Sequence, residues 1–433
     1  MGKKASVSIF TALVLLVGVF SQTALAGGIE NKQNWSARYI ATGSRNAATD
    51  GVDIAAYNPA GVMFQEDGIG LGLDVHYIWK DYEHQYTKFP GGPTVTRDQD
   101  EPSIIPGLFA TYKSGAWGAF GSITNNCGGG SVKYESGNTI TNEIGASLFL
   151  SPTPNPFQTL ISNEMIEADS YYISYTVGGA YRFNEMFSVA AGIRYVDATK
   201  EVKAFADTTS PLGAVYGDYE EDADGWGWVA SANFKPRKDL LFAVRYESRV
   251  ELEFETTVNE TTPLGAGVLN SLGKTQGAKS DRDLPAVLGL GISWDAMDRL
   301  NLNTSFTYYL EEDADWDGEE DLVDNSWDLA FSATYRFLDN LRGSIGYMYT
   351  DVGMDAKDFG LTEQMSPALD AHSFFCGLGY DFSERITFDL GLMTNFYDDQ
   401  TAPDNIPTIA GGGQPVTYDK QNTAVAMGVA FRF

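Results

Sequence analysis

The chain has few of the residues on which enzymes and nucleic-acid-binding proteins usually depend. Its 433 residues include three histidines, two cysteines and 29 Lys and Arg against 58 Asp and Glu, which gives a formal net charge of −29. So acidic a chain is not expected to bind nucleic acid, whose phosphates need a basic surface. His76, His84 and His372 lie near no Gly-x-Ser-x-Gly or His-Glu-x-x-His motif. We therefore expect no enzymatic activity.

Long apolar runs are also missing, except at the N-terminus. Lys3 and Lys4 precede an apolar stretch, and Ala24-Leu25-Ala26 resembles a cleavage site, so residues 1–26 are predicted to be a secretory signal peptide. No later run reaches the roughly 18 apolar residues that a transmembrane helix needs. A chain that crosses a membrane without such helices must form a closed β-barrel. Cys127 and Cys376 are too few for a disulfide framework.

The C-terminal segment, TAVAMGVAFRF, alternates with the two-residue period of a β-strand. The residues of one face are large and apolar and end on a terminal aromatic: Thr423, Val425, Met427, Val429, Phe431 and Phe433. The other face is small or charged: Ala424, Ala426, Gly428, Ala430 and Arg432. Apolar residues toward lipid and small or polar ones toward a lumen are typical of an outer-membrane barrel. An edge strand of a soluble sheet is the alternative.

Segments of this kind recur along the chain. They predict about 14 strands, near residues 68–79, 103–113, 115–124, 169–183, 186–203, 224–235, 239–257, 283–295, 298–310, 325–337, 340–351, 371–383, 385–397 and 422–433. Short turns alternate with long connections, which are expected at 80–102, 125–168, 204–223, 258–282, 311–324, 352–370 and 398–421. Short turns on one rim and long loops on the other are the pattern of bacterial outer-membrane barrels. We predict an all-β fold, a transmembrane antiparallel β-barrel over residues 68–433.

Residues 27–67 do not fit that pattern, because they are rich in Ala, Gly, Ser, Asn and Thr and are too short for a separate domain. Irregular backbone is not tolerated in lipid, so this segment must lie in the periplasm or inside the barrel. A small N-terminal hatch in the lumen is the expectation.

This segment resembles the hatch of the FadL/TodX family of outer-membrane transporters. The matching residues are 36–50, SARYIATGSRNAATD, followed by 55–61, AAYNPAG, in which Asn58-Pro59-Ala60 matches the NPA element of the family. Trp226-Gly227-Trp228 and the segment 240–248, LLFAVRYES, look like its central hairpin, and Asp283-Leu284-Pro285 looks like a strand start of the family.

The resemblance implies a 14-stranded barrel with an N-terminal hatch that takes up hydrophobic molecules by diffusion, with long-chain fatty acids or aromatic and aliphatic hydrocarbons as substrates. It also implies release sideways through a gap at a kinked third strand. The corresponding region here, residues 119–134, contains Asn125, Asn126 and three consecutive glycines, which interrupt a ladder readily.

Two sets of charged residues are candidate sites. Arginines expected to face the lumen could hold a carboxylate head group or could form a ladder that braces the wall: Arg194, Arg245, Arg249 and Arg342. The loop 311–324 has nine acidic residues and no basic one, and four of them match positions of a calcium loop: Asp313, Asp315, Asp317 and Asp324. The alternative for this loop is a solvated acidic rim. Apart from calcium at the surface, we expect no cofactor and no catalytic residue.

The sequence therefore predicts a monomeric protein of the bacterial outer membrane, in contact with membrane lipid and lipopolysaccharide. Its expected function is passive uptake of a hydrophobic small molecule, with release by lateral diffusion. The alternative is a structural or adhesive barrel with acidic surface loops.

Overall fold

A computed structural model describes residues 33–87, 93–127, 130–142, 161–208, 213–407 and 413–433. The predicted signal peptide, residues 1–26, lies outside the described residues. No helix within the described part of the chain is long and apolar enough to cross a membrane.

The structure confirms the predicted fold, because fourteen antiparallel strands form one closed ladder in which the last strand pairs with the first. In ladder order these strands are β1 (Gly68–Thr87), β3 (Ser103–Ser114), β4 (Trp117–Cys127), β6 (Ile161–Arg182), β7 (Phe187–Thr208), β8 (Val215–Arg237), β9 (Leu240–Glu247), β12 (Ala286–Met297), β13 (Leu300–Leu310), β14 (Trp327–Leu338), β15 (Leu341–Asp351), β16 (Ala371–Ser383), β17 (Ile386–Tyr397) and β19 (Gly413–Arg432). Register pairs such as Leu73 with Val429 close the barrel.

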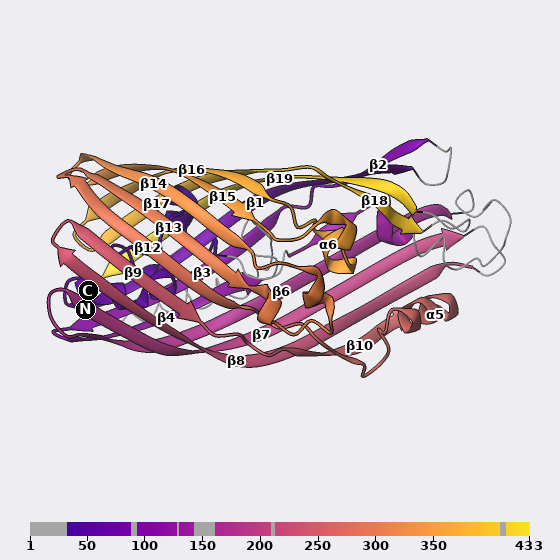
Figure 1. Ribbon diagram of the computed structural model, residues 1–433, viewed down its shortest axis with the longest axis horizontal. Coiled ribbons are helices and arrows are strands. Elements are labelled where there is room, and N and C mark those ends of the chain that lie inside the picture. The colour runs from indigo at the N-terminus through magenta and orange to yellow at the C-terminus, as the bar shows by residue number, and fades with distance from the viewer. Residues whose placement is uncertain (1–32, 88–92, 128–129, 143–160, 209–212, 408–412) are drawn as a thin grey trace, which may run out of the picture.

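The remaining elements lie mostly at one end. Five short strands extend the ladder there: β2 (Thr94–Gln99), β5 (Val132–Tyr134), β10 (Glu253–Thr261), β11 (Lys279–Asp281) and β18 (Gln400–Pro407). The helices are α2 (Ala37–Thr42), α3 (Ile54–Tyr57), η1 (Pro59–Phe64), α5 (Pro263–Ser271), η3 (Glu311–Asp313), η4 (Glu319–Leu322), η5 (Ala356–Asp358) and α6 (Leu361–Met365). We call the end that carries α5 the long-loop rim and the opposite end, where the C-terminus lies, the short-turn rim (Figure 1).

The strand pattern follows the predicted alternation. In β19, Met427 is exposed on the outer face, whereas Ala424 and Ala426 are buried inside the barrel. Large aromatic side chains are exposed on the outer wall, among them Trp117, Trp226 and Phe433. Such a surface fits lipid on the outside, since aromatic residues gather at the two membrane interfaces of a barrel.

Three expected boundaries were wrong. β1 continues to Thr87, and β7 and β8 run together to Thr208 and from Val215, so strand occupies much of the expected loops 80–102 and 204–223. The single strand expected at 239–257 is two strands, because the ladder is broken between β9 and β10 and only an isolated bridge joins Val250 to Leu284. Helices α5 and α6, both in connections that we expected to be loops, were not predicted.

Residues 34–63 are almost entirely buried inside the half of the barrel toward the short-turn rim, where they form the largest hydrophobic cluster together with inward-facing strand residues (Figure 1). α2 contacts β14, β15, β16, β17 and β19, and η1 contacts the strands β3, β4, β6, β7 and β8. We call this buried segment the hatch.

Candidate functional site

The hatch begins with a helix whose first turn is fixed by two polar residues. Ser36 caps α2 by accepting a hydrogen bond from the Tyr39 N–H (3.0 Å), and the Ala37 N–H donates to Asp74 of β1 (2.7 Å). The helix lies close to the wall because Gly391 and Gly428 face Ala37, so that a Cβ on either glycine would crowd the helix. The sequence of small residues thus places α2 directly against the barrel strands.

The Asn58-Pro59-Ala60 turn is held by both the hatch and the wall. The Asn58 side chain donates to the Ala48 carbonyl (2.9 Å), and Pro59 starts η1. The Ala60 N–H donates to Ser231 of β8 (2.8 Å), and the Ala60 carbonyl accepts from Ser188 of β7 (2.9 Å). All three residues of the turn are buried, so the motif sits in the lumen as a fixed point of the hatch.

The ladder of the third barrel strand is interrupted above the hatch. β3 and β4 pair from Ser114 with Trp117 up to Leu108 with Ile123, and within the described residues no pairing joins 103–107 to 124–127. Trp35 of the hatch occupies this place, since its indole N–H donates to the Asn125 carbonyl (3.0 Å) and a Cβ on Gly107 would collide with its carbonyl oxygen. β4 also has a bulge between Asn125 and Cys127 where it pairs with β6.

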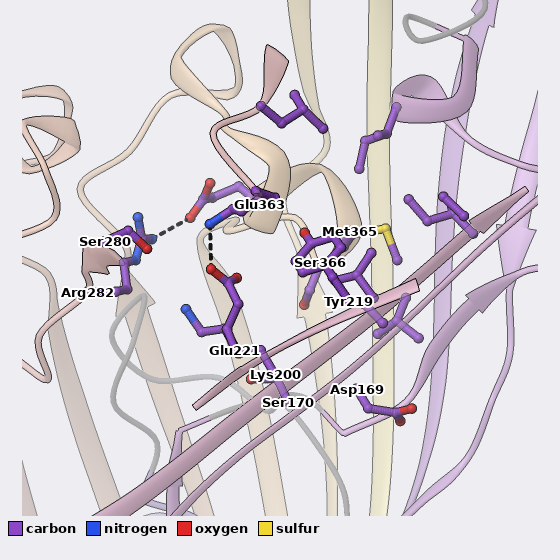
Figure 2. Close-up of a pocket in the computed structure, with 18 of the residues that line it drawn as sticks. Asp169, Ser170, Lys200, Tyr219, Glu221, Ser280, Arg282, Glu363, Met365 and Ser366 are labelled. Carbon is purple, nitrogen blue, oxygen red and sulfur yellow. Dashed lines mark hydrogen bonds and ion pairs between the residues drawn. The ribbon is translucent and has the colours of Figure 1, made fainter. Parts of the chain in front are cut away.

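The half of the barrel toward the long-loop rim contains a cavity of about 530 Å³, which we call the outer cavity (Figure 2). Pockets of this size take small organic ligands. Its walls are largely apolar and come from distant parts of the chain: Cys127, Val132, Ile166 and Tyr172 of the wall strands, Leu269 of α5 and Met365 of α6. Sequence reasoning missed this site because α5 and α6 lay in expected loops.

Charged side chains also line the outer cavity. The Lys200 ammonium lies 4.2 Å from the centre of the Phe254 ring, and Lys420 donates to the Pro367 carbonyl (2.9 Å). Two ion pairs tie the loops over the cavity to each other and to the wall: Lys274 with Glu221 (2.7 Å) and Arg282 with Glu363 (2.9 Å) (Figure 2). The cavity therefore combines an apolar interior with charged groups that can meet a polar end of a ligand.

The four candidate arginines are not brought together, and none of them is among the described residues that line the outer cavity. Arg194 and Arg245 share Glu247, and Arg245 also donates to the Ala56 carbonyl of the hatch (2.7 Å). Arg249 pairs with Asp283 (3.3 Å), and Arg342 pairs with Asp389 near the short-turn rim (2.6 Å). These contacts are those of a bracing ladder, and a role in holding a head group stays a prediction. Lys200 has the same inward parity on β7 as Arg194 and could have been found from it.

The acidic loop brings together two of the four aspartates predicted for calcium. The carboxylate oxygens of Asp315 and Asp317 lie within 4.8 Å of each other and of Asp281, which the sequence reasoning missed; Asp313 and Asp324 are not in this group of described residues. Burial and the carboxylates of Asp315 and Asp317 raise the pKa of Asp281. Cys127 is buried and Cys376 is exposed, and no disulfide joins them.

Comparison with known proteins places residues 166–433 in the family described as outer membrane protein transport protein (OMPP1/FadL/TodX). The chain is 22% identical to a long-chain fatty acid transport protein of Escherichia coli O6:H1, over 88% of this chain and 89% of the relative, and 22% identical to one of Salmonella typhi, over 88% and 90%. In fold it is similar to a FadL homologue of Pseudomonas aeruginosa (TM-score 0.69, 15% identity, 94% and 100% covered) and to the toluene transporter TodX of P. putida (TM-score 0.61, 14% identity, 88% and 94% covered).

Proposed function

The chain belongs to the outer membrane protein transport protein family (OMPP1/FadL/TodX), and we propose that it carries long-chain fatty acids or hydrocarbons passively across the outer membrane. The observation that supports this most directly is the outer cavity, which has apolar walls and lies directly above a barrel half that the hatch fills. A barrel with a purely structural or adhesive role has no use for such a cavity. The named relatives carry a fatty acid or toluene, which are both apolar over most of their surface.

The route that we propose runs sideways. The hatch blocks the axial path, whereas the interrupted ladder between β3 and β4 is covered only by Trp35 and its neighbours. A second space of about 10 Å³, room for roughly one water molecule, lies between the hatch and β4 and is lined by Trp35, Thr124 and Asn126. Since Cys127 lines the outer cavity and Asn126 lines this space, a short shift of β4 connects the two.

Each step of this function is diffusion and binding, so we propose that the protein performs no covalent chemistry. We also propose that it acts as a monomer whose outer wall contacts membrane lipid, with the acidic long-loop rim beside lipopolysaccharide. The exposed aromatic side chains of the outer wall support the lipid contact.

The test is uptake by cells of a strain that lacks its own fatty acid transport protein. Expression of this chain should raise the initial uptake rate of labelled long-chain fatty acids or alkylbenzenes. Leu269→Asp places a charge in the outer cavity and should lower that rate at least tenfold, because a buried unpaired charge excludes apolar ligands.

Gly267→Asp is the matched control on the same helix, since no atom lies within 4 Å of a Cβ built there. It should leave uptake unchanged. If expression changes the uptake of no apolar compound, or if the two variants behave alike, the outer cavity is not the entry site.

A further inference from the structure

Polar side chains form a row across four neighbouring strands between the hatch and the outer cavity. Their register is continuous, since each residue pairs directly with the next: Lys80 of β1, Asn422 of β19, Asn395 of β17 and Ser373 of β16. All four face the lumen and are at most 1% exposed. We call these four residues the inner polar row.

Two members of the row have hydrogen-bonding groups without a partner. Neither the amide oxygen nor the amide nitrogen of Asn395 has one among the described residues, and neither does the Ser373 hydroxyl. Buried polar groups are nearly always hydrogen-bonded, and leaving them unpaired destabilises a fold. A path used only by hydrocarbons would be served better by apolar side chains at these positions. The row is therefore suited to an occupant that carries polar atoms.

Tyr397 separates the row from the outer cavity. It follows Asn395 by two residues on the inner face of β17, lines the cavity, and packs against both the hatch cluster and the hydrophobic cluster nearer the long-loop rim. Its hydroxyl accepts a hydrogen bond from the Asn422 side chain (3.0 Å). Lys420, two residues from Asn422 on β19, lies 4.8 Å from the centre of the Tyr397 ring. Polar groups thus continue without a break from the cavity to the row.

We propose that the inner polar row is a second binding site, which opens when the Tyr397 ring moves aside and which takes the oxygen-bearing head group of an amphiphile. Asn395 offers one donor group and one acceptor, and the Ser373 hydroxyl can act as either, so the pair matches a carboxylic acid, a carboxylate or an alcohol. The hydrocarbon tail of the ligand stays among the apolar walls of the outer cavity. This site rests on the proposed function and narrows its substrate to compounds with a polar end.

The experiment compares three twelve-carbon compounds that differ only in the head: dodecanoate, dodecanol and dodecane. Initial uptake of each labelled compound is measured in cells that lack their own fatty acid transport protein and express this chain. Asn395→Leu, which keeps the size of the side chain, should lower the uptake of dodecanoate and dodecanol about tenfold, the effect of one lost hydrogen bond. Uptake of dodecane should stay the same or rise.

Ser332→Ala is the matched control, because its hydroxyl is also buried without a partner among the described residues but belongs to β14, outside the row. It should leave all three rates unchanged. Heat-modifiable migration in detergent gels shows whether each variant has assembled. If Asn395→Leu does not assemble, Ser373→Ala removes one oxygen atom of the row and is expected to give the same selective loss.

The outcomes separate the two levels of the proposal. Unchanged dodecanoate uptake in Asn395→Leu would mean that the row holds only water, and an equal loss for all three compounds would mean a general packing defect; either result overturns the inner site. If the unmodified chain carries dodecane alone, the transport function stands and the inner site falls. If it carries none of the three, the transport function itself fails.

Discussion

The two halves of the barrel interior are lined by side chains of different kinds. Toward the short-turn rim, alanines and glycines allow hatch and wall to approach closely, as where Ala41 of α2 meets Gly377 of β16. Toward the long-loop rim, larger side chains line an open cavity of about 530 Å³. Close packing in one half and a cavity in the other indicate that the first half excludes water and ions while the second receives a ligand.

Charges are also used differently in the two halves. In the hatch half they are paired inside the protein: Arg38 with Asp389 (2.9 Å) and Arg45 with Asp53 (2.8 Å) join hatch to wall or hatch to itself. In the cavity half, the pairs between Lys274 and Glu221 and between Arg282 and Glu363 lie at the cavity wall instead. The first set fixes a plug, whereas the second set borders the space in which a ligand moves.

Removing the hatch should abolish the contrast and have the largest effect. Deletion of residues 28–61 takes out α2, α3 and the Asn58-Pro59 turn, leaving a barrel whose lower half is lined by polar strand residues such as Asp74 and Asn233. We expect ion-conducting channels in planar bilayers, where the intact chain conducts little or nothing.

The control for this deletion is Asn259→Ala, an exposed change on β10 near the opposite rim, which should not raise conductance. A deletion variant that assembles and conducts no more than the intact chain would mean that the hatch is not the plug.

Arg245→Ala should loosen the hatch half without emptying it. Arg245 is 1% exposed, donates to the Ala56 carbonyl and pairs with Glu247, so its removal takes a support from the hatch and one of two partners from a buried carboxylate. Breaking a buried ion pair costs about 3–5 kcal/mol. The free energy of unfolding in urea, measured in lipid vesicles, should fall by about that amount.

Arg237→Ala is the comparison for this variant, because Arg237 is 60% exposed and its pair with Asp239 lies at a short turn. Exposed pairs contribute little to stability. If the two variants are equally stable, Arg245 does not hold the hatch.

The membrane part of this structure could be predicted from the sequence because its pattern is set by lipid. In β1, apolar residues such as Val75 and Tyr77 face outward, and this alternation ends near Trp79. The strand continues, but outward positions are then occupied by Asp81 and Glu83. The hydrophobic pattern stops where the membrane is expected to stop, whereas the hydrogen-bonded ladder does not, and this is why the expected loop 80–102 was too long.

The outer cavity could not be predicted in the same way, because it depends on contacts between segments far apart in the chain. Lys420 lay in an expected loop, although it is an inward-facing residue of β19. Arg282 and Glu363 meet across 81 residues. The hatch motif was recognised because its residues are contiguous, but the residues that support it, Ser188 and Ser231, carry no pattern of their own.

The smallest expected effect concerns calcium at the long-loop rim, where Asp281, Asp315 and Asp317 could share one ion. Their mutual repulsion raises the pKa of Asp281 in addition to the effect of burial, so the folded state binds a proton there more tightly than the unfolded state does. The repulsion therefore destabilises the fold above that pKa and is relieved as the pH falls through it. A bound calcium ion would relieve the same repulsion at neutral pH. With a Kd of about 1 mM, 10 mM calcium adds about 1.4 kcal/mol and raises Tm by about 2 °C.

Asp315→Asn together with Asp317→Asn should abolish this calcium-dependent rise in Tm, measured by calorimetry in lipid vesicles. The matched control is Asp239→Asn with Asp339→Asn, which removes two exposed carboxylates at the short-turn rim and should leave the rise intact. The rise should also shrink as the pH is lowered through the raised pKa of Asp281, because a protonated carboxyl neither repels its neighbours nor binds the ion. A rise that is the same in both double variants would assign calcium to the acidic surface in general, and the three aspartates would then be part of a solvated rim rather than a site.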